Sequence, residues 1–168
     1  MNWVMKRKKR SVTELQEASN ALHYEVTMFR SLAKGLGSGI AGKSVIGNAL
    51  LESVLMHVRV LIDFFYADNP RDDDIIAEHF FLPLPDEWTN IRPPKSKTLG
   101  EAKNRAHKLL AHLTYTRLST TQETKKWDLI KITNEIENVL RVFLQRVPKD
   151  LLGSRWKASS VAQGKDEQ

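Results

Sequence analysis

An arginine and a histidine seven positions apart, Arg105 and His112, are the pair in this sequence best suited to chemistry on phosphate. On an α-helix seven residues make nearly two turns, so both side chains leave the same face about 10 Å apart along the axis. A guanidinium is permanently cationic and fits a phosphate, and an imidazole exchanges a proton near neutral pH. Together they could bind and cleave a phosphodiester.

A structural role is the alternative interpretation of His112. The residue is flanked by leucines, so its ring could be half-buried on a helix and hydrogen-bonded to a nearby threonine or tyrosine. The two interpretations differ in what the loss of the imidazole would change, which is RNA cleavage in one case and stability in the other.

Three charged residues, Glu52, Arg59 and Asp63, form one stripe on an otherwise apolar helical stretch, because they stand at positions i, i+7 and i+11. Charges are rarely buried without a partner, so Arg59 and Asp63 could pair on the solvent side. Alternatively, the stripe faces Arg105 and His112. Carboxylates there would orient the arginine and set the protonation of the histidine.

The segment from Gly37 to Ser44 fits the short phosphate-loop pattern of nucleoside triphosphatases. That loop needs a buried strand before it to aim backbone N–H groups at the phosphates, whereas the preceding residues here follow a helical pattern. We therefore predict a helix–helix loop and no nucleotide site. The N-terminus of the next helix, near Lys43 and Ser44, could still receive an anion.

The basic character of the chain is concentrated in one short run. The net charge is +6, and five of these charges come from Lys6, Arg7, Lys8, Lys9 and Arg10, so subtracting five from six leaves +1 for the remainder. The run could bind RNA, DNA or an acidic membrane, or it could be a solvated end. The isoelectric point is therefore no argument for nucleic-acid binding by the folded part.

Some chemistries are excluded by composition. The sequence has no cysteine, which rules out disulfides, cysteine-bound zinc and a thiol nucleophile and suits the cytoplasm. The histidines lack metal-ligand spacing, since Leu61 stands four residues after His57. We expect no metal and no cofactor. We also expect no membrane span, because the apolar stretch 49–66 carries four ionisable groups.

Helical periodicity runs through most of the chain. A first helix is predicted from a capping box at Ser11–Glu14 to about Lys34, where glycines interrupt the pattern. A second helix, apolar on most sides and hence central, is expected at 44–67. A short helix with acidic residues at its N-terminus is expected at 72–81.

The second half contains one irregular stretch, 82–97, whose Trp88 should pack back on the helices. A capping box at Thr98–Glu101 opens a helix that runs to about Leu118. Another box, Thr120–Glu123, precedes the last long helix, which a proline ends.

No strand pattern or internal repeat accompanies these helices. The expected fold is all-α, an antiparallel bundle of four main helices plus one short helix. We expect the bundle to occupy residues 11–152 as a single domain. A basic flexible tail is expected at 1–10 and a polar flexible tail at 153–168.

Arg105 and His112, with six residues between them, fit the Arg-x4–6-His motif of HEPN domains (higher eukaryotes and prokaryotes nucleotide-binding). The segments 51–65 and 111–117 are similar to those of a group of uncharacterised bacterial HEPN-like proteins. The resemblance covers roughly residues 45–145. It implies an all-α bundle of four or five helices.

Many HEPN proteins are metal-independent ribonucleases of toxin–antitoxin or defence systems, so the resemblance implies an endoribonuclease. Arg105 would hold the scissile phosphate and stabilise charge in the transition state. His112 would be the general base or acid that moves the proton of the 2′-hydroxyl or of the leaving oxygen. Lys108, one turn from each, would add positive charge.

The resemblance also implies a homodimer in which the motif pairs meet, with RNA and an antitoxin or another protein as further partners. The alternative function is a non-catalytic helical module. Such a module would dimerise, or would bind a partner protein or a nucleic acid through the basic N-terminal tail.

Overall fold

The computed structural model describes residues 9–39, 42, 44–84, 86–110, 115 and 127–163. Within this part of the chain the regular elements are helices and no strand occurs, so the predicted all-α class is confirmed. The elements are α1 Val12–Gly37, α2 Val45–Phe65, the 3₁₀ helix η1 Ala77–Phe81, α3 Asp86–Ile91, α4 Lys97–Leu110, α5 Leu129–Arg146, the 3₁₀ helix η3 Lys149–Leu151 and α6 Ser154–Gln163. The long helices α1, α2, α4 and α5 correspond to the four predicted main helices.

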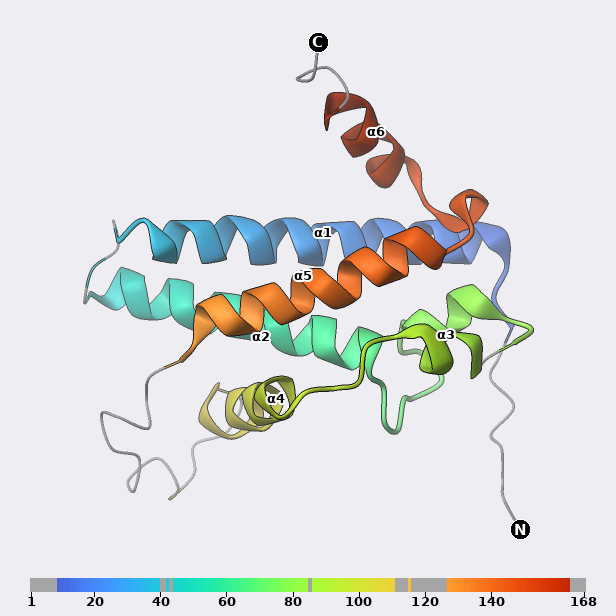
Figure 1. The fold of residues 1–168 in the computed structure, drawn as a ribbon. Coiled ribbons are helices and arrows are strands. Elements are labelled where there is room, and N and C mark those ends of the chain that lie inside the picture. The colour runs from blue at the N-terminus through green and yellow to red at the C-terminus, as the bar shows by residue number, and fades with distance from the viewer. Residues whose placement is uncertain are drawn as a thin grey trace.

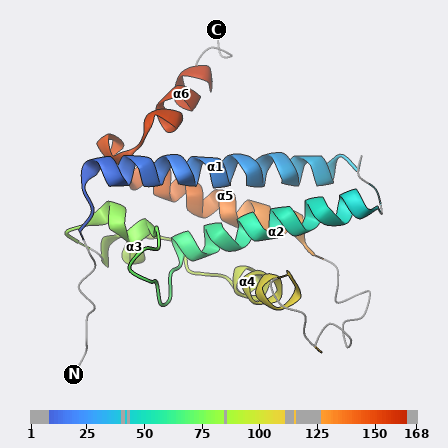
Figure 2. The same ribbon diagram turned by 180° about the vertical axis from the view of Figure 1, so that it is seen from behind.

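Three of the long helices lie side by side, with α1 running in one direction and α2 and α5 in the other (Figure 1). Helix α4 is seen almost end-on in Figure 1 and again from behind in Figure 2, so it crosses α2 at a steep angle. Helix α2 contacts α1, α4 and α5, which is the central position that its apolar sequence predicts. By length and composition α2 is apolar enough to cross a membrane, but its buried side chains form part of the core of this bundle.

Serine side chains start the first two helices. Ser11 Oγ accepts a hydrogen bond from the Glu14 N–H at 3.2 Å, and the Glu14 carboxylate accepts one from the Ser11 N–H at 2.7 Å, which is the predicted capping box. Ser44 Oγ accepts the N–H of Gly47 at 3.1 Å and so caps α2. Helix α1 continues past its expected end to Gly37, because the side chain of Leu36 still packs against the core.

Aromatic side chains fill the core where α2, η1, α3 and α5 meet. The ring of Phe143 lies 5.9 Å from that of Phe65, 5.5 Å from that of Phe80 and 5.6 Å from that of Trp88, measured between centroids. Trp88 is 0% exposed, and its Nε1–H donates to the Phe65 carbonyl oxygen at 2.9 Å. The prediction that Trp88 packs back on the helices is confirmed. The bond also satisfies a carbonyl at the end of α2.

The prediction of a helix at 72–81 is wrong for the first half of that range. There the chain forms a turn in which the Asp74 carboxylate accepts the Arg71 N–H at 2.7 Å, and helical structure is limited to the 3₁₀ turn Ala77–Phe81. The aspartate that was expected to stabilise a helix N-terminus instead bonds to the backbone of a local turn.

The boundaries before α4 also differ from those predicted. The stretch 82–97, expected to be irregular, contains the short helix α3. Helix α4 begins at Lys97, because Ser96 Oγ accepts the Leu99 N–H at 3.1 Å and takes the capping role that the sequence assigned to Thr98.

The predicted continuation of this helix to Leu118 and the capping box at 120–123 lie outside the described residues. Helix α5 is capped by Asp128, whose carboxylate accepts the Lys131 N–H at 3.0 Å. The last long helix therefore starts with an aspartate cap of its own.

The flexible tail predicted at 153–168 is wrong for residues 154–163, which form α6. The Gly153 N–H donates to Ser19 Oγ at 2.7 Å, and the Trp156 Nε1–H donates to the Ser19 carbonyl oxygen at 2.7 Å. In Figure 1 the start of α6 lies against α1 and the rest projects away from the bundle. A helix attached mainly at one end has no long apolar stripe, and so periodicity did not reveal it.

Gly153→Ala is expected to loosen the attachment of α6. An added Cβ would lie 2.3 Å from Asn20 Oδ1 and 2.5 Å from the Gln16 carbonyl oxygen, so the backbone has to shift and the bond to Ser19 is weakened. We expect a loss of about 1–3 kcal/mol in the free energy of unfolding, measured by denaturant titration. The control is Gly100→Ala in α4, where nothing lies within 4 Å. It should stabilise by about 0.5–1 kcal/mol, and equal stability of the two variants would contradict the contact.

Candidate functional site

Arg105, one of the two residues of the Arg-His motif, lies on helix α4. Its orientation is fixed by Leu99, Ala102 and Ala106, which recur at helical spacing and are buried against the bundle. Arg105 lies beside this buried stripe and is itself half-buried. His112 lies outside the described residues, so the structure places only the arginine of the pair.

Arg105 is held against an aromatic ring. Its guanidinium carbon lies 4.0 Å from the centroid of the Trp127 ring. Trp127 directly precedes Asp128, the cap of α5, so the contact lies where α4 meets the start of α5. A cation over an indole face is attracted by the ring quadrupole. The contact therefore positions a permanent positive charge at this junction.

The charged stripe on α2 contacts a different residue of α4 from the one predicted. Asp63 Oδ1 lies 2.7 Å from Lys103 Nζ, where the sequence analysis expected Arg105. Two residues on a helix differ in direction by about 200°, so Lys103 and Arg105 lie on opposite sides of the buried stripe of α4. The ion pair between Arg59 and Asp63, the alternative interpretation, is present with Nε and Oδ2 3.7 Å apart.

The remaining supporting residues lie at the surface. Glu52 is exposed on α2, two turns before Arg59. Lys108 is exposed on α4, three residues after Arg105. Only Lys108 is therefore close along the helix to the arginine of the motif.

Lys103 belongs to a wider charge network that the sequence analysis missed. Its Nζ lies 3.6 Å from Asp68 Oδ2, and Lys95 Nζ lies 3.1 Å from the same oxygen. The hydrogen bond from Lys95 lowers the pKa of the Asp68 carboxyl below its ordinary value, and the nearby Lys103 charge acts in the same direction. The network joins the end of α2 to α4. No sequence signal marks it, since its members belong to separate segments.

A groove of about 720 Å³ runs along this network between α1, α2, the loop after α2 and α4. Its walls carry both signs of charge, with Arg59 and Lys103 beside Asp63, Asp68 and Asp73. A nucleic-acid backbone needs concentrated positive charge. The mixed charges of the groove do not provide it.

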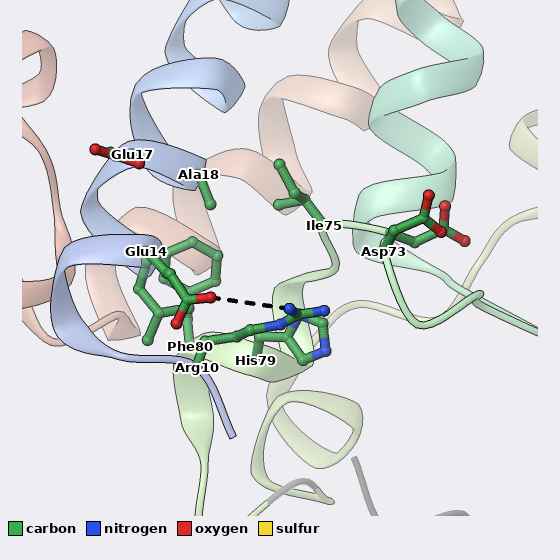
Figure 3. Close-up of a pocket in the computed structure, with 10 residues that line it drawn as sticks. Arg10, Glu14, Glu17, Ala18, Asp73, Ile75, His79 and Phe80 are labelled. Atoms are coloured by element: carbon green, nitrogen blue, oxygen red, sulfur yellow. Dashed lines mark ion pairs between the residues drawn. The ribbon is translucent and has the colours of Figure 1, made fainter. Parts of the chain in front are cut away.

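A second hollow of about 310 Å³ lies between the start of α1, the loop that contains Asp73 and Asp74, and η1. Figure 3 shows Arg10 and Glu14 pointing toward one another here, with Arg10 Nη1 4.0 Å from Glu14 Oε1. The Arg10 guanidinium also donates to the carbonyl oxygen of Asp72. The buried ring of His79 lines the same hollow.

These contacts concern the basic run 6–10, which was predicted to be a flexible tail. Arg10 binds the protein itself, although the sequence analysis assigned it to a flexible tail or a nucleic-acid contact. Lys9 is exposed, and Lys6, Arg7 and Lys8 lie outside the described residues. Arg10 is therefore engaged in the fold and is a poor candidate for a nucleic-acid ligand.

One close pair links α1 to α2 without having been predicted. His57 Nδ1 lies 2.6 Å from Glu25 Oε2, and both side chains are mostly buried. The ring of Tyr24 approaches the same imidazole edge-on, with centroids 6.2 Å apart. The sequence carries no signal for this pair, because the partners are 32 residues apart on different helices.

The segment from Gly37 to Ser44 lies between two helices. Helix α1 precedes it, and Ser44 Oγ is used to cap α2. Lys43 lies outside the described residues. The strand that a phosphate loop requires is replaced by a helix, as the sequence analysis expected.

The described ranges contain no group of three or more histidine, cysteine, aspartate or glutamate residues arranged to hold a metal ion. No protein-family model, curated protein or solved structure matches this chain. We therefore infer function from the chemistry of the residues.

Proposed function

We propose that this protein is a HEPN-like endoribonuclease that acts without a metal ion, with its site on the Arg105 side of α4. The observation that carries the proposal is the guanidinium of Arg105, 4.0 Å from the centroid of the Trp127 ring at the junction of α4 and α5. The contact keeps the guanidinium at this junction, because a cation is attracted to an indole ring. A guanidinium carries N–H donors in a fixed fork, which is the group best suited to bind a phosphate in a bidentate manner.

The surroundings of Arg105 support the same site. Asn104 and Lys108 are exposed on the same helix, and they add a polar donor and a second positive charge near the arginine. His112 follows by seven residues, the spacing that a helix needs to present both groups on one face. In the proposed reaction, His112 removes the proton of the 2′-hydroxyl, whose oxygen attacks the phosphate bound by Arg105. The bond between phosphorus and the 5′-oxygen of the next nucleotide breaks as the 2′,3′-cyclic phosphate forms, and the leaving oxygen takes a proton from water.

The test is digestion of a mixed-sequence RNA by the full chain in the presence of EDTA. We expect fragments that end in a 2′,3′-cyclic phosphate and begin with a 5′-hydroxyl. The same RNA with 2′-O-methyl groups should resist, because its 2′-oxygen has no proton to give. Cleavage that EDTA abolishes would contradict the metal-independent mechanism, and absence of cleavage would favour the second candidate.

The second candidate is a non-catalytic binding module, which is favoured by apolar side chains exposed on α2. Val45 and Ile46, at the start of that helix, are 84% and 69% exposed. Large apolar side chains gathered on one surface are typical of protein contacts. In this case Arg105 and Trp127 form a packing contact only. RNA then stays intact at every protein concentration.

A further inference from the structure

Helix α4 is held against the bundle mostly by small side chains. It contacts α2 and α5, and from Lys97 to Lys108 its buried residues are Leu99, Ala102 and Ala106. An alanine presents a single methyl group, so it lets two helices approach closely but interlocks little with its neighbours. Packed helices keep their rotation through side chains that fit into grooves on the facing helix. The apolar contact therefore selects the side of α4 that faces the bundle and leaves the exact rotation to other contacts.

Two polar contacts hold α4 on opposite sides of this buried face. On one side Lys103 Nζ lies 2.7 Å from Asp63 Oδ1 and 3.6 Å from Asp68 Oδ2. On the other side the guanidinium carbon of Arg105 lies 4.0 Å from the centroid of the Trp127 ring. Lys103 and Arg105 leave the helix about 200° apart. A rotation of α4 that moves one side chain toward the bundle moves the other away from it, so the two contacts are coupled.

We infer that Lys103 is a positioning residue, whose ion pair with Asp63 sets the rotation of α4 and thereby the place of the Arg105 guanidinium over the Trp127 ring. The pair joins two helices, since Asp63 lies on α2 and Lys103 on α4. The Lys103 side chain is 25% exposed, so salt screens its charge less than that of a fully exposed lysine. The effect on cleavage rests on the proposed function, whereas the position of Arg105 is measurable without RNA.

Nuclear magnetic resonance of the full chain, without RNA, tests the position of Arg105. An indole ring shifts the resonances of groups that lie over its face, so the side-chain signals of Arg105 report its contact with Trp127. Their loss in Arg105→Lys assigns them, and Trp127→Ala gives their positions without the ring. Lys103→Met keeps the length of the side chain and removes the charge. It should move the Arg105 signals a large part of the way toward their positions in Trp127→Ala.

Lys97→Met is the matched control. It makes the same change in net charge on the same helix, but Lys97 Nζ lies 3.7 Å from Glu101 Oε1, within α4 itself. That pair does not join α4 to the bundle, so the Arg105 signals should stay in place. Lys103→Arg keeps a cation opposite Asp63 and should retain most of the wild-type shift.

Asp63→Asn removes the charge from the other side of the same ion pair. It should displace the Arg105 signals in the same direction as Lys103→Met, and the double variant should add little, because either change alone already breaks the pair. Exposed and partly exposed ion pairs contribute little to stability, so circular dichroism should show the helices retained in both variants. If one variant fails to fold, the other still tests the inference.

RNA cleavage adds a readout that a purely structural role would not change. A catalytic group misplaced by about 1 Å can lower a rate about 10²-fold, so we expect Lys103→Met to lower kcat about tenfold at an unchanged melting temperature. Lys97→Met should cleave as the wild type does, and Lys103→Arg should recover most of the lost rate.

Two results would overturn the inference: Arg105 signals that stay in place in Lys103→Met and Asp63→Asn, and signals that move equally in Lys97→Met. Displaced signals in a protein whose wild type leaves RNA intact would support the positioning role and reject the proposed nuclease. Cleavage by the wild type together with unmoved signals would reject the positioning role alone.

Discussion

His112→Ala is expected to lower the rate of RNA cleavage by about 10²–10⁴-fold, the usual contribution of a general acid or base. A histidine that faces a solvent cleft costs little stability when removed, so the melting temperature should stay close to that of the wild type. His107→Ala is the matched control, because His107 lies on α4 with Arg105 but lines the groove on the Lys103 side. Cleavage by the His107 variant should equal that of the wild type.

The arginine of the pair should be equally sensitive to its geometry. Arg105→Lys keeps the charge but loses the two parallel N–H donors, so cleavage should fall with little change in folding. Trp127→Phe keeps an aromatic face for Arg105 and should retain more activity than Trp127→Ala, which removes it.

The opposite pattern would identify a structural histidine. If His112→Ala lowers the free energy of unfolding by about 1–3 kcal/mol and the wild type never cleaves RNA, the imidazole is a buried hydrogen-bonding group. That pair of results would reject the nuclease and retain the binding module.

Trp88→Ala should be among the most destabilising single substitutions in this protein. The side chain is fully buried among the aromatic rings of α2, η1 and α5, and its removal leaves a large cavity. Losses of about 3–5 kcal/mol are typical of such a change, a large part of the stability of a domain of this size. Chemical denaturation followed by circular dichroism measures the difference.

Trp88→Phe separates packing from hydrogen bonding. The Phe65 carbonyl oxygen also accepts a hydrogen bond from Arg92 Nη1 at 2.7 Å, so it keeps a partner when the indole N–H is lost. We therefore expect Trp88→Phe to cost clearly less than Trp88→Ala. Leu84→Ala, at a side chain that is 65% exposed, should change stability by less than about 0.5 kcal/mol. Equal losses in the two Trp88 variants would mean that the aromatic packing contributes little.

The sequence predicted most of the helical framework because helix signals are local. Apolar periodicity placed α1, α2 and α5, and the capping box at Ser11 was read from its residues alone. The start of α4 was misplaced because Ser96 and Thr98 are both acceptable caps, and their surroundings decide between them. A single sequence does not contain those surroundings.

The candidate site was harder to predict, since it depends on how the helices are turned relative to one another. Periodicity identified Asp63 as part of a charged stripe, and it identified α4 as a partner helix. Whether Lys103 or Arg105 meets that carboxylate depends on the rotation of α4 about its axis, which the buried residues Leu99 and Ala102 set against the bundle. Contacts between distant segments, such as His57 with Glu25, leave no trace in local spacing.

The hydrogen bond from Gly153 to Ser19 has a consequence for the order of folding during synthesis. The two residues are 134 positions apart, and α1 also contacts η3 and α6 from the end of the described chain. A ribosome releases α1 and α2 long before these partners, so the first two helices can pair early while Ser19 still faces solvent. Because such long-range contacts form last, the nascent chain keeps one side of α1 uncovered until almost the whole sequence has emerged.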